Sequence, residues 1–407
     1  MKWSATRARR AACGLILCLL SAAACRQLPF LGRKKGPASW REVPAAKLAF
    51  KFQPDTNPPA NAIPPDNPAA LPAIQNDFTA NRNEQLLART ISSPDGQRAL
   101  AVYATAEEQN NEYRLDMYAA DGKFLRNVTP PSLAVIFPER VAWADDGQRI
   151  AFIGRKSSSK AAGNEAEAAP TPASVEGEPA AIPPEPGMTP IGATQSNGPV
   201  FAPVPTFNTE QIYTADRDGF NLKPLTNREG LIYFYLDWAP DGHALAALAC
   251  RESEWNAREA AGRIPHGRPR LLSPDGQETP LSDTLAEAPP VWSPDSAKVA
   301  VGFNTEIEVY DAATAAPTRA RLSVREPLWQ SSLAFDQKTF AQPPNNGPAV
   351  ASNAPPASYQ PIVRLAWPDP ATLYTQTAFV RVYANGPVNN FPRWHLMTFS
   401  PQAGALK

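Results

Sequence analysis

The sequence predicts an all-β protein, a β-propeller of six four-stranded blades, with five blades as the open alternative. Three observations predict this fold. A short motif with an aspartate at a fixed position recurs along the chain, its copies are spaced like propeller blades, and a second hairpin signal follows several copies. With 43% hydrophobic and 19% charged residues among 407, the composition is that of a globular protein.

The repeated motif consists of an apolar segment with a tryptophan, a turn, and a second apolar segment. In its clearest copies a hydrophobic residue lies four positions after the turn aspartate and an alanine lies five positions after it. The aspartates that set this register are Asp146, Asp241, Asp295 and Asp336, with looser copies at Asp95 and Asp369.

The spacing of the copies matches that of propeller blades. Successive register aspartates are 51, 95, 54, 41 and 33 residues apart, and the long interval contains a proline-rich stretch of 49 residues, 157–205. Without that stretch 46 residues remain, against about 40 to 50 for a four-stranded blade. Trp292, Trp329 and Trp367, which are 37 and 38 residues apart, independently support the fourth, fifth and sixth copies.

The turn chemistry explains why each copy should form a hairpin. Proline presets a turn dihedral, aspartate accepts a hydrogen bond from its own backbone two residues on, and glycine supplies a positive φ. Further Asp-Gly turns within 115–122, 212–219 and 271–276 predict second hairpins, so that two hairpins make one blade. The regular spacing of the tryptophans favours packing between neighbouring sheets over a role as binding platforms.

The N-terminus has the layout of an export signal. Residues 1–24 contain basic residues, an apolar run at 11–20, and small residues directly before Cys25. This arrangement resembles the lipobox of bacterial lipoproteins, and the resemblance implies that Cys25 carries a lipid anchor. Ala22-Ala23-Ala24 also suits an ordinary signal peptidase, so simple secretion stays open. We therefore expect export to the cell envelope, in the periplasm or on the outer surface.

Proline clusters divide the rest of the chain. We expect residues 25–85 to form a mostly disordered tether with a possible closing strand at 47–52. Residues 86–407 then form the propeller, interrupted by a disordered loop at 157–205 and a proline-rich loop at 343–358.

Two segments, 292–295 (Trp-Ser-Pro-Asp) and 212–226, resemble the WD40-like repeats of TolB-like bacterial β-propellers. The resemblance covers residue 86 to the C-terminus, and similar blades occur in Tol-system components, lipid-anchored binding proteins and prolyl oligopeptidases. The chain departs from TolB-like proteins in having a tether where they carry a folded domain. It also lacks the Gly-x-Ser-x-Gly elbow of the oligopeptidases.

Candidate chemical groups are few. His243, His266 and His395 lack metal-ligand spacing, and no glycine-rich nucleotide motif occurs, so we expect neither a metal nor a cofactor. Residues 216–221 have the spacing of a calcium-loop fragment, but a downstream acidic ligand is missing and a hairpin turn explains them better. Cys250 ends an apolar run and should be a small buried residue rather than a reactive thiol.

Two surface features bear on function. The loops carry many acids that could supply a carboxylate pair for glycoside chemistry, although the sequence does not say which of them converge. Residues 251–263 predict a short charged helix on the rim, either for partner contact or as solvated surface.

These observations favour a noncatalytic cell-envelope lipoprotein, monomeric, that serves as a binding scaffold for a protein, peptide or glycan. Balanced charge, with 39 basic and 39 acidic residues and no basic patch, argues against a nucleic-acid partner. The alternatives are an envelope hydrolase or lyase with its active site on blade loops, and a structural subunit of a Tol-like envelope assembly. No binding residue can be named from the sequence.

Overall fold

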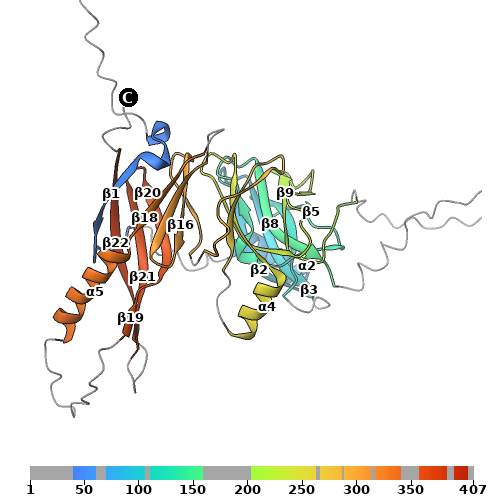
Figure 1. Ribbon diagram of the computed structural model, residues 1–407. Helices are drawn as coiled ribbons and strands as arrows, with labels where there is room; N and C mark the ends of the chain where they lie inside the picture. Colours follow the sequence, from blue (N-terminus) through green and yellow to red (C-terminus); the bar gives the residue numbers. More distant parts are fainter. Residues whose placement is uncertain are drawn as a thin grey trace, which may run out of the picture.

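The computed structural model describes residues 40–60, 70–105, 111–158, 203–262, 266–286, 288–312, 317–340, 357–382 and 389–401. The expected signal segment, Cys25 and most of the two expected proline-rich loops lie outside these residues. The described residues form five antiparallel sheets that follow one another along the chain (Figure 1).

The first three sheets are made of consecutive strands. The first sheet has β2 (Gln85–Ser92), β3 (Arg98–Thr105), β4 (Arg114–Ala119) and β5 (Phe124–Asn127). The second has β6 (Leu133–Val135), β7 (Ala142–Trp143), β8 (Arg149–Lys156), β9 (Gln211–Asp216) and β10 (Lys223–Pro224). The third has β11 (Leu231–Trp238), β12 (Leu245–Arg251), β13 (Arg268–Leu272) and β14 (Glu278–Pro280).

The fourth and fifth sheets complete the array. The fourth has β15 (Val291–Trp292), β16 (Lys298–Phe303), β17 (Glu306–Asp311) and β18 (Arg319–Ser323). The fifth has β1 (Leu48–Gln53), β19 (Ala357–Tyr359), β20 (Ile362–Asp369), β21 (Thr372–Val382) and β22 (Asn389–Pro401). The helical segments are η1 (Trp40–Glu42), η2 (Ala45–Lys47), η3 (Pro138–Arg140), α2 (Pro72–Asn81), α4 (Glu252–Ala260) and α5 (Arg325–Phe340).

Most register aspartates make the turns that the sequence predicts. Oδ1 of Asp146 accepts the backbone N–H of Gln148 at 2.9 Å, and Oδ1 of Asp241 accepts that of His243 at 3.0 Å. Gly147 then takes a φ of 66°, a left-handed conformation that glycine adopts at little cost. These local bonds fix the hairpin geometry, so the strands on either side pair in register.

Neighbouring sheets pack face to face through continuous apolar clusters. One cluster joins Leu100 and Met117 of the first sheet to Phe152 of the second, and similar clusters join each later pair of sheets. Trp143, Trp238, Trp292 and Trp367 lie in these clusters. The indole N–H of Trp292 donates to the carbonyl oxygen of Asp237 in the preceding sheet, at 3.1 Å. These four tryptophans therefore pack between sheets.

The fifth predicted copy of the motif is wrong. Asp336 lies in α5, because the segment Arg325–Phe340 forms a helix instead of a hairpin. Trp329, which was expected in the core, is 54% exposed on that helix. The described residues hold five sheets, so the expected sixth blade is not confirmed, and no strand pairing among them joins the first sheet to the fifth.

The N-terminal residues contact both ends of the array. β1 pairs antiparallel with β22 in the fifth sheet, from Leu48 opposite Pro401 to Gln53 opposite Leu396. α2 lies within the stretch expected to be a tether, and its Ile74 and Phe78 pack on the first sheet. Figure 1 shows β1 at one end of the molecule and α2 at the other.

Candidate functional site

A groove of about 600 Å³ opens where the second and third sheets meet α4. Its walls come from η3, from the residues before β9, from the start of β11, and from α4. The residues that matter for chemistry are Glu139, Arg155, Glu210, Glu252, Trp255 and Glu259. We call this cavity the acidic groove.

Helix α4 lies within the segment that the sequence predicts as a charged rim helix. Its first turn is fixed by Glu254, whose two carboxylate oxygens accept hydrogen bonds from Arg268 of β13 at 2.7 and 2.8 Å. Glu254 Oε2 also accepts the backbone N–H of Arg251 at 2.9 Å. The bonds from Arg268 are the main cause that lowers the pKa of Glu254 to about 2. The helix therefore holds its groove-lining residues in a defined position.

Glu210 lies in the wall of the acidic groove and is only 8% exposed. Burial raises its pKa above the usual range, and the nearby carboxylate of Glu252 adds to this, although Arg155 opposes it. Arg155 Nη1 lies 3.2 Å from Glu210 Oε1, and Arg155 Nη2 lies 3.6 Å from Oε1 of the buried Glu112. The guanidinium is thus shared by two carboxylates and neutralises Glu210 only in part. Glu210 therefore binds a proton more readily than an exposed glutamate does.

An aromatic cluster forms the inner side of the groove. The Trp255 ring lies 5.9 Å from that of Phe137 and 5.5 Å from that of Phe234, measured between centroids. All three rings line a second cavity of about 210 Å³, which we call the aromatic pocket. Phe137, Glu139 and Trp255 line both cavities, so the two are adjacent.

A second pair of carboxylates lies close to the aromatic pocket. Burial raises the pKa of Asp237 on β11 to about 7, and the charge of Asp145 adds to this effect. Arg140 opposes the shift, and its guanidinium lies over the ring of Tyr235, 4.4 Å from the centroid. Asp237 and Asp145 line neither cavity, so Glu210 and Glu252 are the acid pair of the groove itself, which the sequence could not name.

The histidines and the free cysteine lie elsewhere. His243 is exposed in a turn, and the buried His395 lies 3.0 Å from the hydroxyl of Thr377, with its pKa lowered to about 4 mainly by burial. His266 is half-buried after α4 and does not line either cavity. Cys250 is buried, as expected, and burial raises its thiol pKa to about 11, which argues against a reactive thiolate.

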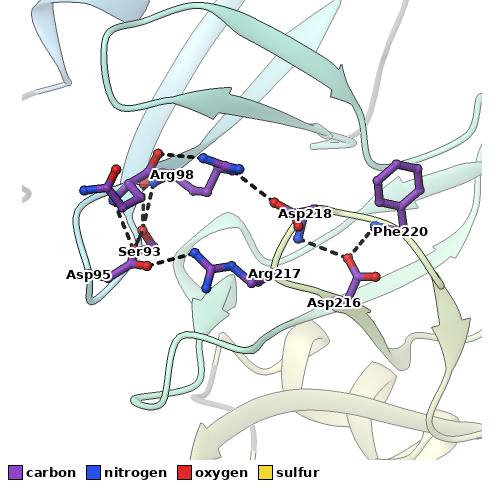
Figure 2. Close-up of polar contacts among 8 residues, drawn as sticks. Ser93, Asp95, Arg98, Asp216, Arg217, Asp218 and Phe220 are labelled. Carbon is purple, nitrogen blue, oxygen red and sulfur yellow. Dashed lines mark hydrogen bonds and ion pairs between the residues drawn. The ribbon is translucent and has the colours of Figure 1, made fainter.

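The segment 216–221 forms a hairpin turn, in agreement with the sequence interpretation (Figure 2). Oδ1 of Asp216 accepts the backbone N–H groups of Asp218 and Phe220 at 3.0 and 2.8 Å. The neighbouring side chains join the first two sheets through two ion pairs, Arg217 with Asp95 at 2.9 Å and Arg98 with Asp218 at 3.1 Å. Across the described ranges, no group of three or more histidine, cysteine or acidic side chains could hold a metal ion.

Sequence reasoning missed Glu210, Arg155 and Glu139. Glu139 lies in η3, Arg155 near the end of β8 and Glu210 directly before β9, all in the second sheet or its connections, where a charged residue is ordinary. Arg155 and Glu210 meet because β8 pairs with β9 across the long proline-rich stretch between them, which the sequence pattern does not reveal. The available signal was the long charged segment 251–263, which supplies α4 and Trp255. Within the described residues no helix has the length and apolar character that crossing a bilayer requires.

No known family model matches the chain, and no curated protein matches it in sequence. Similar solved structures include one from a study of two prolyl endopeptidases (11% identity, TM-score 0.36, 94% of this chain and 46% of that chain). Prolyl oligopeptidase B from Galerina marginata (8%, 0.37, 86% and 45%) and dipeptidyl peptidase 4 from Porphyromonas gingivalis (10%, 0.35, 75% and 46%) are also similar. The chain spans less than half the length of each of these proteins.

These neighbours agree with an all-β fold of the propeller type and do not single out TolB-like proteins. At such low identities the likeness concerns the fold alone. The structures found first are those of peptidases and do not bear out the expected noncatalytic scaffold, which is corrected here; the hydrolase alternative is a proposal and is argued below from the groove itself.

Proposed function

We propose that this chain is a hydrolase whose reacting groups lie in the acidic groove. The observation that carries the proposal is Glu210, a buried carboxyl group in the wall of an open cavity, with its pKa raised by burial and a second carboxylate, Glu252, close enough to add to that shift. Carboxyl groups whose environments differ in this way are typical of acid and base pairs in hydrolases.

The two carboxyl groups have complementary roles in the proposed reaction. Glu252, exposed on α4, accepts a proton from a water molecule as that water attacks the substrate. The bond to the leaving group breaks, and Glu210 donates its proton to the leaving atom. Arg155 then stabilises the Glu210 carboxylate that remains. Exchange of protons with solvent restores both groups for the next cycle.

The wider setting of this activity also remains a proposal. We infer a TolB-like propeller as the architecture, with five or six blades, exported to the cell envelope and anchored through a lipid on Cys25. The support is the signal-like N-terminus and the array of four-stranded sheets. The proposed substrates are peptides or glycans of the same compartment.

The test is hydrolysis of a panel of fluorogenic peptides and nitrophenyl glycosides by the purified chain. We expect Glu210→Gln to reduce kcat by about 10²- to 10⁴-fold, because glutamine cannot donate a proton. Activity of the wild type should fall as the pH rises through the raised pKa of Glu210, since the ionised form has no proton to give.

The matched control is Glu84→Gln, which changes an exposed glutamate between α2 and β2 that does not line the groove. It should leave kcat unchanged. Equal rates for the two variants, or no turnover of any substrate in the panel, would contradict the proposed function.

A further inference from the structure

The charge of the acidic groove selects for a cation. Four glutamates line it, Glu139, Glu210, Glu252 and Glu259, against the single guanidinium of Arg155. That guanidinium is already shared by Glu210 and the buried Glu112. Glu139 has Arg89 nearby, whereas no lining cation faces Glu252 or Glu259, so a ligand with an ammonium or guanidinium group would add a favourable charge there.

The adjacent aromatic pocket has the opposite character. Its lining includes Phe234, Leu248, Ala286, Ala288 and Pro289, together with the aromatic residues that it shares with the groove. A cavity of about 210 Å³ with such walls has room for one bulky apolar side chain. Burying such a side chain removes apolar surface from water, which is favourable.

Arg140, in the pocket lining, lies over the ring of Tyr235 but lacks a hydrogen-bond acceptor for its Nε. Arg140 makes no side-chain hydrogen bond within the described ranges, and its Nε is buried with no acceptor. A buried donor of this kind is costly unless it is satisfied. A ligand cannot reach the Nε itself, but Arg140 is only half-buried and lines the pocket, so a carbonyl oxygen on a ligand there can accept from the rest of its guanidinium. A peptide main chain carries such a carbonyl beside every side chain.

From these three features we infer that the groove and the pocket together bind a peptide that has a basic residue next to a bulky apolar residue. The basic side chain enters the acidic groove, the apolar side chain fills the aromatic pocket, and the main-chain carbonyl between them accepts from Arg140. This inference rests on the proposed function for its site, and it names the substrate class that the site takes.

The experiment measures binding of short capped peptides to the full chain by titration calorimetry. The probes are acetyl-Ala-Lys-Phe-Ala-amide, the same peptide with Lys replaced by Glu, the same peptide with Phe replaced by Ala, and a glucosamine tetramer. We expect the Lys-Phe peptide to bind at least tenfold more tightly than either altered peptide. Mass spectrometry of each sample after titration reports whether the peptide has been cleaved.

Two variants with matched controls assign the contacts. Glu259→Lys should weaken binding of the Lys-Phe peptide at least tenfold, whereas Glu84→Lys, at an exposed site outside the groove, should not. Phe234→Ala should remove most of the preference for Phe over Ala, whereas Phe220→Ala, at a 51% exposed loop position, should keep it. Thermal unfolding of each variant confirms that it is folded.

The outcomes separate this inference from the proposed function. Preference for the Lys-Phe peptide without cleavage supports the binding inference and contradicts the hydrolase. Cleavage without that preference supports the hydrolase and contradicts the binding inference. Tighter binding of the glucosamine tetramer than of the Lys-Phe peptide would overturn the inference in favour of an amino-sugar ligand.

Discussion

Replacement of Asp237 by asparagine should stabilise the protein at neutral and alkaline pH. Asp237 lies on β11, where burial raises its pKa to about 7 from an ordinary value of 3.8. The charge of Asp145 adds to the shift and Arg140 reduces it. Since the folded state favours the protonated carboxyl, an amide of the same shape should suit the site better than the ionised carboxylate does.

The magnitude follows from the size of the shift. About three pKa units at 1.36 kcal/mol each correspond to about 4 kcal/mol, which is an upper value because the side chain keeps some accessible surface. The folded pKa is raised, so the free energy of unfolding of the wild type falls as the pH rises from about 4 to about 7 and then levels off. We expect Asp237→Asn to gain about 2 to 4 kcal/mol at pH 8 and almost nothing at pH 4.

Urea denaturation at pH 4, 6 and 8 measures this difference. Asp283→Asn is the matched control, because Asp283 is exposed, and it should change the free energy of unfolding by no more than about 0.5 kcal/mol at each pH. The reasoning would be refuted by a gain of the same size at pH 4 and pH 8, or by a loss of stability at pH 8.

Two further predictions concern packing between elements. Trp292→Phe should cost about 1 kcal/mol more than Trp238→Phe in urea denaturation, because only the Trp292 indole donates to a carbonyl of the preceding sheet whereas the buried Trp238 Nε1 has no partner in the described structure. Equal losses would show that the hydrogen bond contributes nothing. Arg82→Met should cost about 3 to 5 kcal/mol, because it leaves the fully buried Asp116 without its ion pair at 2.7 Å, and adding Asp116→Asn should recover most of that loss. A double variant no more stable than Arg82→Met would contradict this explanation.

The sheets could be predicted from the sequence because their determinants are local. The hydrogen bond of a turn such as Asp146-Gly147 is made within the turn itself, so these few residues predict the hairpin whatever the rest of the chain does. The prediction of a hairpin at Asp336 is wrong because it, too, relied on local sequence alone. A hydrophobic residue and an alanine at four and five positions on fit a helix as well as a hairpin, and nothing in those few residues decides between the two.

Helix α2 shows a different limit. Proline-rich sequence before it favours a tether, yet Pro72 lies at the helix start, where proline is tolerated, and Ile74 and Phe78 are four residues apart on one face. That face is short, and it is buried only because the first sheet offers a matching surface of Ala99, Ala101, Tyr103 and Tyr118. Tertiary packing, and not the local sequence, determines this helix.

The candidate site was the hardest part to predict. Glu210 precedes β9 in the second sheet and Glu252 begins α4 after the third, so their convergence depends on how two sheets stack. The raised pKa of Glu210 depends on burial, which no spacing rule reports. The one usable signal was Trp255 within an unusually long charged segment. It indicated where a surface site could lie, but not which residues would react there.

The N-terminal residues connect the two ends of the array, whose described strands include no pairing between the first sheet and the fifth. Each terminal sheet of a stack has one face or edge without a neighbour, and these are the places where a stack loses order first. β1 covers the edge of β22 in the fifth sheet, and α2 covers the free face of the first sheet. Because β1 and α2 are close in sequence, the chain between them links the two ends covalently. The N-terminal residues therefore contribute to the burial of both terminal sheets, β1 through strand pairing and α2 through apolar packing.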